Sequence, residues 1–356
     1  MKVAVEEVGQ VNQKNVHSYT LLNDNGIEIR CLDYGCHITK IFVPDRDGNK
    51  ENIVLGYETL EDYVSDNSFF GCVVGRVAGR IKGGTFEIDG KTYPLAKNEN
   101  NNHIHGGVKG FNRVVWDADP FDTEQEVGVR FSYLSPNGEE GYPGNINIKV
   151  TYTLNNKNEL NIHYSATSDE KTVLNMTNHS YFNLSGNVKR DICDHTLTVK
   201  SDQYLPLNEE LLPTGELASV NGTPFDFTSE KFIRTGMEAD HPQNILAGKG
   251  YDHPFVLHTH HNEEIILKDQ ESGRFLTIET DEPAVVIYSG NQISSEGKIL
   301  GVPSRKYLGI CFETQGLPDA IHHPHFPQWI IERNQEYHSS TTYRFGTFDK
   351  NIQKRG

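Results

Sequence analysis

The sequence has few cysteines, an excess of negative charge and no long apolar run, and each of these features excludes a class of protein. Its five cysteines are odd in number and form no Cys-x-x-Cys pair. The chain of 356 residues is also far longer than the small domains that disulfides hold together, so we expect reduced thiols. Lys and Arg number 33 against 49 Asp and Glu, giving a net charge of −16. This charge disfavours nucleic acid and anionic membranes as partners and suits a small neutral ligand better.

No uncharged apolar segment approaches the length that spans a membrane, and no apolar stretch follows Lys2 at the N-terminus. The sequence therefore predicts a soluble, cytoplasmic protein. Methionine is also scarce, at 3 residues, whereas the chain has 32 Gly, 16 Tyr and 17 Phe. Aromatic residues favour strands and glycines favour tight turns, so this composition indicates β structure rather than helix.

Alternation of apolar and polar residues with period two recurs along the chain and predicts half-buried strands. Segments of this kind lie at 27–30, 86–89, 127–131, 146–150, 160–164, 197–199, 275–278, 285–288 and 342–345. Turn signals separate them, and Asp89-Gly90 stands where a tight hairpin requires positive φ. No helical period extends beyond a turn or two. We therefore expect consecutive strands to pair as antiparallel hairpins.

The organisation of the chain gives no sign of a domain boundary. No linker or change of composition marks one, although residues 205–247 form a long stretch rich in turns and prolines. A regular internal repeat is not visible either, which disfavours a propeller. The sequence predicts a single domain over residues 1–356, of all-β class, built as a large antiparallel β-sandwich.

Two segments place basic or titratable side chains beside glycine. Arg76 and Arg80 occur in Gly-Arg-Val-Ala-Gly-Arg-Ile, and taken alone they are best explained as solvated or salt-bridged arginines. His103 and His105 precede two glycines, which allow a ligand to approach the backbone closely. Two histidines at this spacing also suit a metal.

Two further segments combine a titratable group with apolar neighbours. His179 begins His-Ser-Tyr-Phe, and a lone histidine here is most simply a structurally bonded one. Glu313 occupies an apolar strand, on the face opposite Phe312. Burial there raises the pKa of the carboxyl group and makes it a better base near neutral pH. A structural pair with an arginine explains it equally well.

Two other features have simpler interpretations. Asp252, in Tyr-Asp-His-Pro-Phe, is a turn former by its position before a proline-containing loop. His322, His323 and His325 resemble a metal tract in composition, but the neighbouring prolines break regular ligand geometry. No matching Cys or Glu cluster accompanies them in the sequence, so we expect no metal there.

Taken together and in this order, the segments resemble the aldose 1-epimerase family, also called galactose mutarotases. The shared pattern is Gly-Arg-x-Ala-x-Arg-Ile, His-Gly-Gly, Asn-His-x-Tyr-Phe-Asn-Leu, Asp-His-Pro-Phe, and Glu-Thr-Gln followed by Pro-Asp-Ala. It runs from Arg76 to Ala320, and the flanking strands extend the resemblance over essentially the whole chain. Each motif alone is weak, but five in sequence are specific. The resemblance implies the galactose mutarotase-like supersandwich, a large antiparallel β-sandwich with a sugar groove.

The resemblance also implies the site residues. The family's catalytic acid falls on His179 and its catalytic base on Glu313, while its sugar-binding residues fall on Arg80, His105 and Asp252. The implied activity interconverts the α and β anomers of free hexoses such as galactose and glucose. The expected partner is a monosaccharide, and the chain is expected to be a monomer or a homodimer. Some relatives carry asparagine in place of Gly79 and glutamine in place of Val286, two departures that concern substrate preference rather than the reaction.

This chemistry needs one acid and one base, because opening the hemiacetal removes a proton from the C1 hydroxyl and adds one to the ring oxygen. No cofactor and no metal are required. Histidine suits the acid role because its pKa is about 6.5 in water. We expect the rate to fall at low pH as Glu313 gains a proton and at high pH as His179 loses one. Tyr181 is a candidate to pack on the sugar, whereas Phe182 is expected in the core.

Three alternatives remain at the level of the sequence. A hexose-6-phosphate 1-epimerase needs an extra basic pocket for the phosphate, which no segment clearly supplies. A glycoside hydrolase needs two facing carboxylates, and Glu313 with Asp252 is the pair available. A non-catalytic sugar-binding module would have no use for an acid–base pair, so His179 and Glu313 together argue against it.

Overall fold

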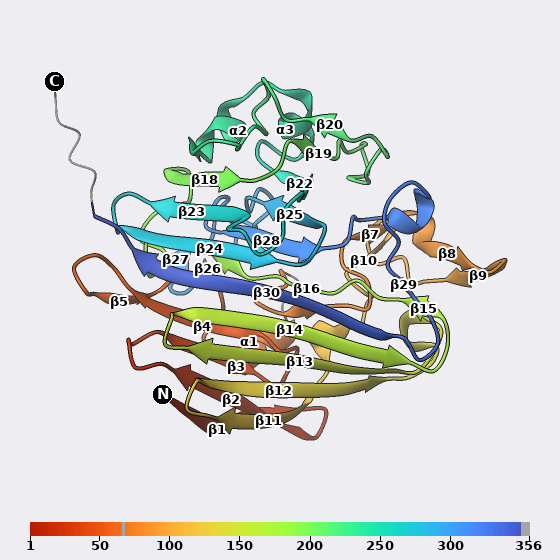
Figure 1. Ribbon diagram of the computed structural model, residues 1–356, viewed down its shortest axis with the longest axis horizontal. Coiled ribbons are helices and arrows are strands. Elements are labelled where there is room, and N and C mark those ends of the chain that lie inside the picture. Colours follow the sequence, from red (N-terminus) through yellow and green to blue (C-terminus); the bar gives the residue numbers. More distant parts are fainter. Residues whose placement is uncertain (66–67, 350–356) are drawn as a thin grey trace.

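The computed structural model describes residues 1–65 and 68–349, and its largest sheet in that part of the chain has nine antiparallel strands (Figure 1). Their order is β11-β12-β13-β14-β30-β24-β23-β18-β21. The bounds are β11 (Asp117–Asp122), β12 (Glu126–Ser135), β13 (Ile146–Asn155), β14 (Glu159–Ser168), β18 (His195–Val199), β21 (Lys231–Phe232), β23 (Ile265–Asp269), β24 (Arg274–Thr280) and β30 (Glu336–Thr347).

Two further sheets complete the main layers. A five-stranded sheet follows chain order, with β1 (Lys2–Val11), β2 (Lys14–Leu22), β3 (Glu28–Leu32), β4 (Ile38–Pro44) and β5 (Lys50–Asn52). A six-stranded sheet has the order β17-β28-β25-β22-β19-β20. Its strands are β17 (Tyr181–Phe182), β19 (Gln203–Tyr204), β20 (Ala218–Ser219), β22 (Asp252–Val256), β25 (Ala284–Tyr288) and β28 (Ile310–Gln315).

The remaining elements are short. Five two-stranded pairs are β6 (Val73–Val74) with β16 (Thr177–Asn178), β7 (Arg80–Ile81) with β10 (His103–Ile104), β8 (Thr85–Ile88) with β9 (Lys91–Pro94), β15 (Thr172–Val173) with β29 (Ile330–Ile331), and β26 (Lys298–Ile299) with β27 (Val302–Pro303), all within the described ranges. The helices there are α1 (Leu60–Ser65), α2 (Arg234–Glu238), α3 (Pro242–Leu246) and the 3₁₀ turns Lys82–Gly84, Phe111–Arg113, Glu139–Gly141 and Ala320–His322. The predicted all-β class with little helix is confirmed.

Each predicted strand overlaps an observed one, with Ile27 and Asp89 just outside, but the hairpin expectation holds only in part. In the β8–β9 hairpin, Asp89 and Gly90 have φ of 51° and 77°, as a tight turn of this type requires. Consecutive strands are also paired neighbours from β1 through β5 and from β11 through β14. In the middle of the large sheet, however, β30 lies between β14 and β24 and pairs with both. Period two predicts strands but not which distant strands become neighbours.

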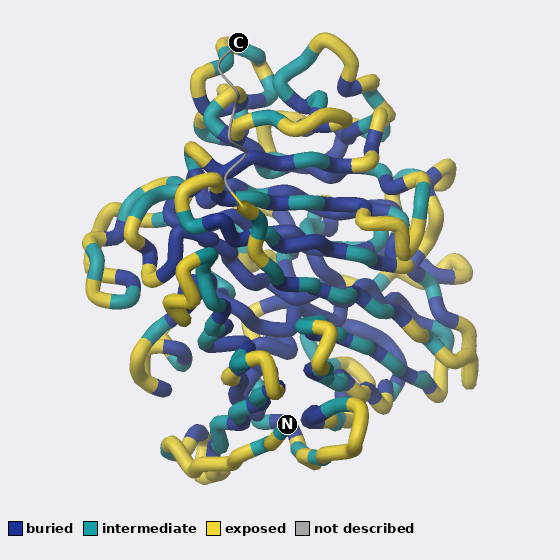
Figure 2. Tube along the Cα trace, turned by 60° about the vertical axis from the view of Figure 1, so that its left-hand side comes forward, coloured by how far each residue is buried: buried dark blue, intermediate teal, exposed yellow. Residues whose placement is uncertain are grey.

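The core lies between the sheets and follows the predicted alternation. In β13 and β14 the apolar residues of alternate positions are buried, while their neighbours are partly exposed. One cluster of buried side chains includes Ile29 of the five-stranded sheet, Val150 of the nine-stranded sheet and Phe312 of the six-stranded sheet. Burying each such side chain contributes about 1.5–3 kcal/mol. Figure 2 shows this interior as buried strands beneath exposed turns.

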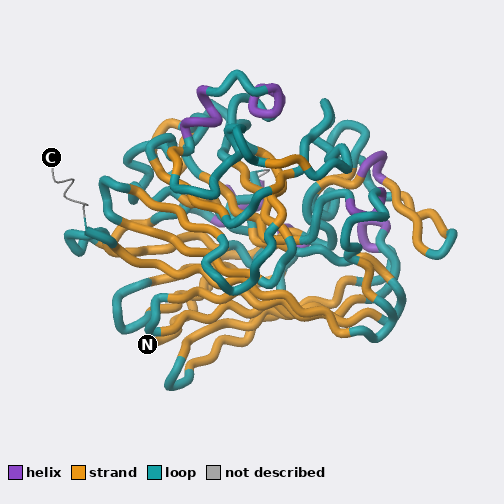
Figure 3. The backbone as a smooth tube through the Cα atoms, turned by 45° about the horizontal axis from the view of Figure 1, so that its top comes forward, coloured by secondary structure: helices purple, strands orange, loops and turns teal. Residues whose placement is uncertain are grey.

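In Figure 3 the long strands run across the lower half of the view, whereas the short helices lie among loops toward the top and right. All five cysteines are free thiols, as predicted from their number and spacing. Among residues 1–65 and 68–349, no helix combines the length and the apolar character that crossing a bilayer requires.

Candidate active site

One face of the six-stranded sheet forms the floor of the site. Across β17, β28, β25 and β22, the pairing aligns four residues in one row: Tyr181, Cys311, Tyr288 and Asp252. Two residues along, on the same face, Glu313 lies opposite Val286. Because side chains alternate along a strand, Cys311 and Glu313 share one face of β28, and Phe312 points into the core on the other. The apolar strand thus places a single carboxylate on the floor of the site.

A cavity of about 730 Å³ lies over this floor. Its lining includes all five residues that the sequence motifs single out: Arg80, His105, His179, Asp252 and Glu313. Cavities of this size hold small-molecule ligands in other proteins. Residues that are far apart in the chain therefore converge on one space large enough for a sugar.

His105 is held by a tight backbone turn at the end of β10. Its φ is 51°, its backbone N–H donates to the carbonyl of Gly79, and the Gly79 N–H donates to Nδ1 of the ring at 3.3 Å. Gly106 follows with φ of 81°, and a Cβ at this position would collide with the carbonyl of Gly75. Burial, together with the charges of His179 and Arg80, lowers the pKa of His105 well below its usual range. The neutral ring accepts at Nδ1, so its proton lies on Nε2.

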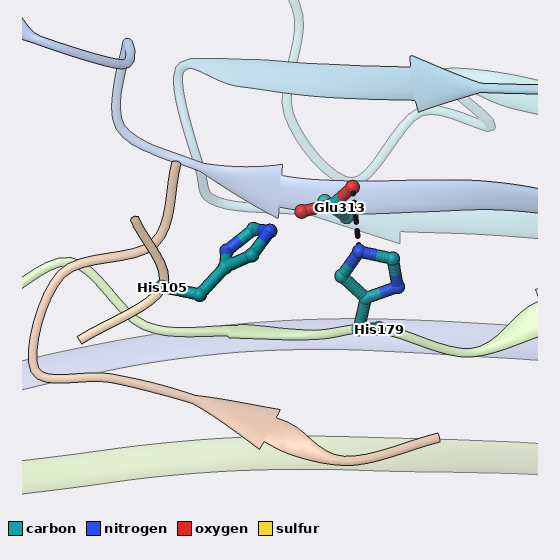
Figure 4. A group of neighbouring side chains, drawn as sticks. All are labelled: His105, His179 and Glu313. Atoms are coloured by element: carbon teal, nitrogen blue, oxygen red, sulfur yellow. Dashed lines mark ion pairs between the residues drawn. The ribbon is translucent and has the colours of Figure 1, made fainter. Parts of the chain in front are cut away.

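His179 and Glu313 are in direct contact in Figure 4, where His179 approaches the strand that carries Glu313. Nε2 of His179 lies 3.3 Å from Oε1 of Glu313, and both side chains are almost completely buried. The backbone of His179, between β16 and β17, donates to the carbonyl of Cys72 and accepts from the N–H of Gly71. The Sγ of Cys311 lies 3.5 Å from Nδ1 on the other side of the ring. The imidazole is therefore fixed from both edges.

Burial moves the two pKa values of this pair in opposite directions. It raises the pKa of the Glu313 carboxyl to about 8, with a further rise from the charge of Asp252 and an opposing effect from Arg80. It lowers the pKa of the His179 imidazole to about 4. Both shifts favour the uncharged forms, a protonated Glu313 and a neutral His179. These directions are opposite to the ones on which the expected pH limbs of Glu313 and His179 rest, and the assignment of the limbs stays a prediction.

Arg80 and Asp252 form the charged wall of the cavity. Arg80 makes a bidentate ion pair with Glu99, with Nε–Oε2 at 2.6 Å and NH2–Oε1 at 2.7 Å. Burial lowers the pKa of Arg80, but the charges of Asp252 and Glu99 more than offset this, and the pKa is raised overall. Burial also raises the pKa of Asp252, and Arg80 opposes that rise. Asp252 is the first residue of β22, so its predicted place in a turn is wrong.

Arg76 has a structural position outside the cavity lining. Its guanidinium is buried and donates to Oγ and the carbonyl of Ser135 and to the carbonyls of Pro136, Pro143 and Gly144. The expectation of a solvated or salt-bridged arginine is therefore wrong for Arg76, whereas Arg80 is indeed salt-bridged.

Sequence reasoning missed several residues that line the cavity, among them Phe69, Tyr288 and Glu99. The ring of Phe69 lies 4.8 Å from that of His105 and 5.9 Å from that of His179. Phe69 and Tyr288 belong to none of the motifs considered, and Glu99 stands in an Asn-rich run that is typical of a surface loop. Tyr181 lines the cavity, and Phe182 packs against Phe312 and Tyr343 in the core, as expected.

The side chains that meet in Figure 4 also have the composition of a metal site. His105, His179 and Glu313 each offer one ligand atom, and these atoms lie within 4.8 Å of one another. Two imidazole nitrogens and a carboxylate oxygen are ligands that zinc accepts.

In the histidine tract, His322 and His325 contact different groups of the chain. Nδ1 of His322 lies 2.6 Å from a carboxylate oxygen of Asp319, and Nε2 of His325 donates to the carbonyl of Gly215 at 2.8 Å. The expectation that the tract holds no metal stays a prediction.

Comparison with known proteins places this geometry in a family. The sequence profile of the family described as aldose 1-epimerase matches residues 17–344. The chain is 41% identical to a galactose mutarotase of Bos taurus over 334 residues, which is 93% of this chain and 94% of that protein. It is 34% identical to an aldose 1-epimerase of Escherichia coli over 92% of this chain and 94% of that protein. A crystal structure of galactose 1-epimerase from Lactobacillus acidophilus superposes with a TM-score of 0.88 at 31% identity, covering 98% and 99% of the two chains.

Proposed function

This chain belongs to the aldose 1-epimerase family, and from that premise we propose which side chains carry the reaction and where the proton rests. The protein is an aldose 1-epimerase, an isomerase that interconverts the α and β anomers of sugars. Its partner is a small sugar molecule. The observation that carries the proposal is the 3.3 Å contact between Nε2 of His179 and Oε1 of Glu313 inside the cavity.

We propose that His179 is the acid and Glu313 the base, and that their contact allows one proton to move between them. In the resting enzyme the proton lies on Glu313. When a sugar binds, this proton moves from Glu313 to Nε2 of His179, which gives an imidazolium and a carboxylate. The carboxylate then takes the proton of the C1 hydroxyl while the imidazolium protonates the ring oxygen, and the ring opens. This leaves a protonated Glu313, a neutral His179 and an open-chain aldehyde.

The open-chain sugar therefore stands beside a pair that has regained its resting protonation. Rotation about the C1–C2 bond presents the other face of the aldehyde. In closure, His179 removes the proton of the C5 hydroxyl and Glu313 protonates the carbonyl oxygen. Each proton that leaves the pair in one half of the reaction returns in the other, so no cofactor and no metal enter the proposed chemistry.

The sugar hydroxyls are held by Arg80, His105 and Asp252 in this proposal. His105 donates from Nε2, since its Nδ1 already accepts from Gly79. Arg80 has five N–H groups and uses two for Glu99, which leaves three for hydroxyl oxygens. Asp252 accepts. Donors and acceptors on separate elements define the orientation of the ring.

The physiological setting is also part of the proposal. We infer free galactose and glucose as substrates, a single functional domain over the whole chain, a cytoplasmic location and a monomer or homodimer. Nucleic acid and membranes are excluded as partners in this proposal because the net charge is −16.

The direct test is polarimetry on freshly dissolved α-D-galactose and α-D-glucose. The proposal expects the enzyme to accelerate the approach of both solutions to anomeric equilibrium, and saturation with sugar concentration. Optical rotation that changes at the spontaneous rate would refute it. Release of a smaller sugar from an oligosaccharide would instead favour the hydrolase alternative.

A further inference from the structure

Glu99 lines the cavity and forms a bidentate ion pair with the guanidinium of Arg80. Both of its carboxylate oxygens are used, at 2.6 Å and 2.7 Å from two nitrogens of the same group. The side chains are 29% and 13% exposed, so the pair is only partly screened by water. A bidentate, charge-assisted pair fixes both the position and the plane of an arginine.

Hydrogen bonds in the loop around Glu99 hold this residue in place for its ion pair with Arg80. Glu99 and Asn102 exchange two backbone hydrogen bonds, of 3.1 Å and 2.9 Å. The side chain of Asn98 bonds both backbone groups of Ile104, the residue before His105. Ile104 in turn pairs with Arg80 across β10 and β7. The loop therefore fixes Glu99 relative to Arg80 and to His105.

Glu99 also sets the charge of the cavity. Among the lining residues are two arginines, Arg80 and Arg113, and three carboxyl groups, Glu99, Asp252 and Glu313. With Glu99 in its bidentate pair, the positive charge of Arg80 is largely compensated. An anionic sugar that approaches this wall therefore meets a neutralised arginine, and a phosphate competes with Glu99 for the same two N–H groups.

We propose that Glu99 is a positioning and specificity residue, which orients Arg80 toward the hydroxyls of a neutral sugar and disfavours phosphorylated sugars. The inference rests on the proposed function, because it takes Arg80 to contact the substrate. It gives a physical reason why this cavity serves free hexoses rather than hexose phosphates.

The test is Glu99→Gln, which keeps the size and one acceptor oxygen but removes the charge. With galactose, we expect KM to rise about tenfold while kcat changes by less than about threefold, since the orientation of Arg80 is lost but the proton pair is intact. With glucose 6-phosphate as a competitor of galactose turnover, we expect its inhibition constant, divided by that of glucose, to fall about tenfold. Glu99→Asp should restore much of both values.

Asp89→Asn is the matched control. Asp89 pairs with Lys171 at 3.0 Å on the surface, outside the cavity lining, and asparagine also adopts its φ of 51°. It makes the same change of charge and should leave both measurements unchanged.

The outcomes separate this inference from the proposed function. If the unmodified enzyme fails to accelerate mutarotation, the proposed function fails. If the enzyme is active and Glu99→Gln has the KM of the unmodified enzyme and the same ratio of inhibition constants, the role of Glu99 is refuted. A rise in KM without any change in that ratio refutes the specificity role and leaves only positioning. A drop in kcat larger than the rise in KM would refute the positioning role as well.

Discussion

Nε2 of His179 lies 3.3 Å from Oε1 of Glu313, and the two side chains are only 6% and 5% exposed. A separation this short, away from bulk water, makes proton exchange between the two groups direct. It also means that the pair is described best by the number of protons it holds. The proposed resting state at neutral pH holds one proton, because burial raises the pKa of Glu313 to about 8 and lowers that of His179 to about 4.

The first prediction concerns the pH dependence of kcat/KM, which reports on the free enzyme. The active form holds one proton. As pH falls through about 4, His179 gains a second proton and the rate should fall. As pH rises through about 8, Glu313 loses the only proton and the rate should fall again. Polarimetry from pH 3.5 to 9.5 checks this, and a rate that stays level as pH rises through about 8, with no basic limb, would contradict it.

The second prediction assigns the basic limb to one residue. The side chain introduced by Glu313→Gln cannot ionise, so the fall in rate near pH 8 should disappear. The value of kcat should also fall by at least about 10²-fold, the lower end of what general acid–base catalysis supplies. The residual activity should be flat across that range. Persistence of the same basic limb in Glu313→Gln would assign it to another group.

The third prediction concerns divalent metals. The proposed chemistry moves only protons, so dialysis against a chelator should leave kcat and KM unchanged. Added zinc should inhibit competitively with sugar, because it would be coordinated by His105, His179 and Glu313, the side chains that bind and transform the sugar in the proposed reaction. Chelation should reverse the inhibition, and His105→Asn should weaken it. Loss of activity on chelation would overturn the metal-free mechanism.

The fourth prediction separates stability from the site. Arg76→Met keeps an unbranched apolar stem but removes the guanidinium, which leaves the carbonyls of Pro136, Pro143 and Gly144 without this donor. We expect the free energy of unfolding to fall by about 3 kcal/mol or more in urea titrations. The KM for galactose of the folded enzyme should stay close to that of the unmodified protein. A large rise in KM without loss of stability would place Arg76 in the site instead.

Local patterns were sufficient to predict the strands and the class of fold, because period-two burial is a property of each segment by itself. They were insufficient for the sheet order. The pairing of Tyr181 with Cys311, which sets His179 beside Glu313, joins residues whose sequence separation no alternation encodes. The motifs identified the five expected site residues only through resemblance to a family. Physical reasoning on each segment alone left Arg80, His179 and Glu313 with structural explanations of equal or greater weight.

The errors have physical causes of the same kind. Asp252 was expected in a turn because Pro254 follows, but Pro254 fits β22, where its carbonyl accepts from Leu205. Glu99 was missed because its role depends on the pairing of β7 with β10, which brings Arg80 alongside. The pKa shifts of Glu313 and His179 depend on depth of burial, a property of the assembled sheets rather than of any segment.

The fifth and most direct test of the account is the turnover of His179→Asn, measured by polarimetry alongside sugar binding by calorimetry. Asparagine keeps a polar side chain of similar reach but has no titratable nitrogen. The account predicts a fall of at least about 10²-fold in kcat, the lower end of what general acid catalysis supplies, with galactose affinity roughly unchanged. Turnover near the rate of the unmodified enzyme would contradict the account, and His105, whose ring centroid lies 5.3 Å from that of His179, would then be the first candidate for the acid.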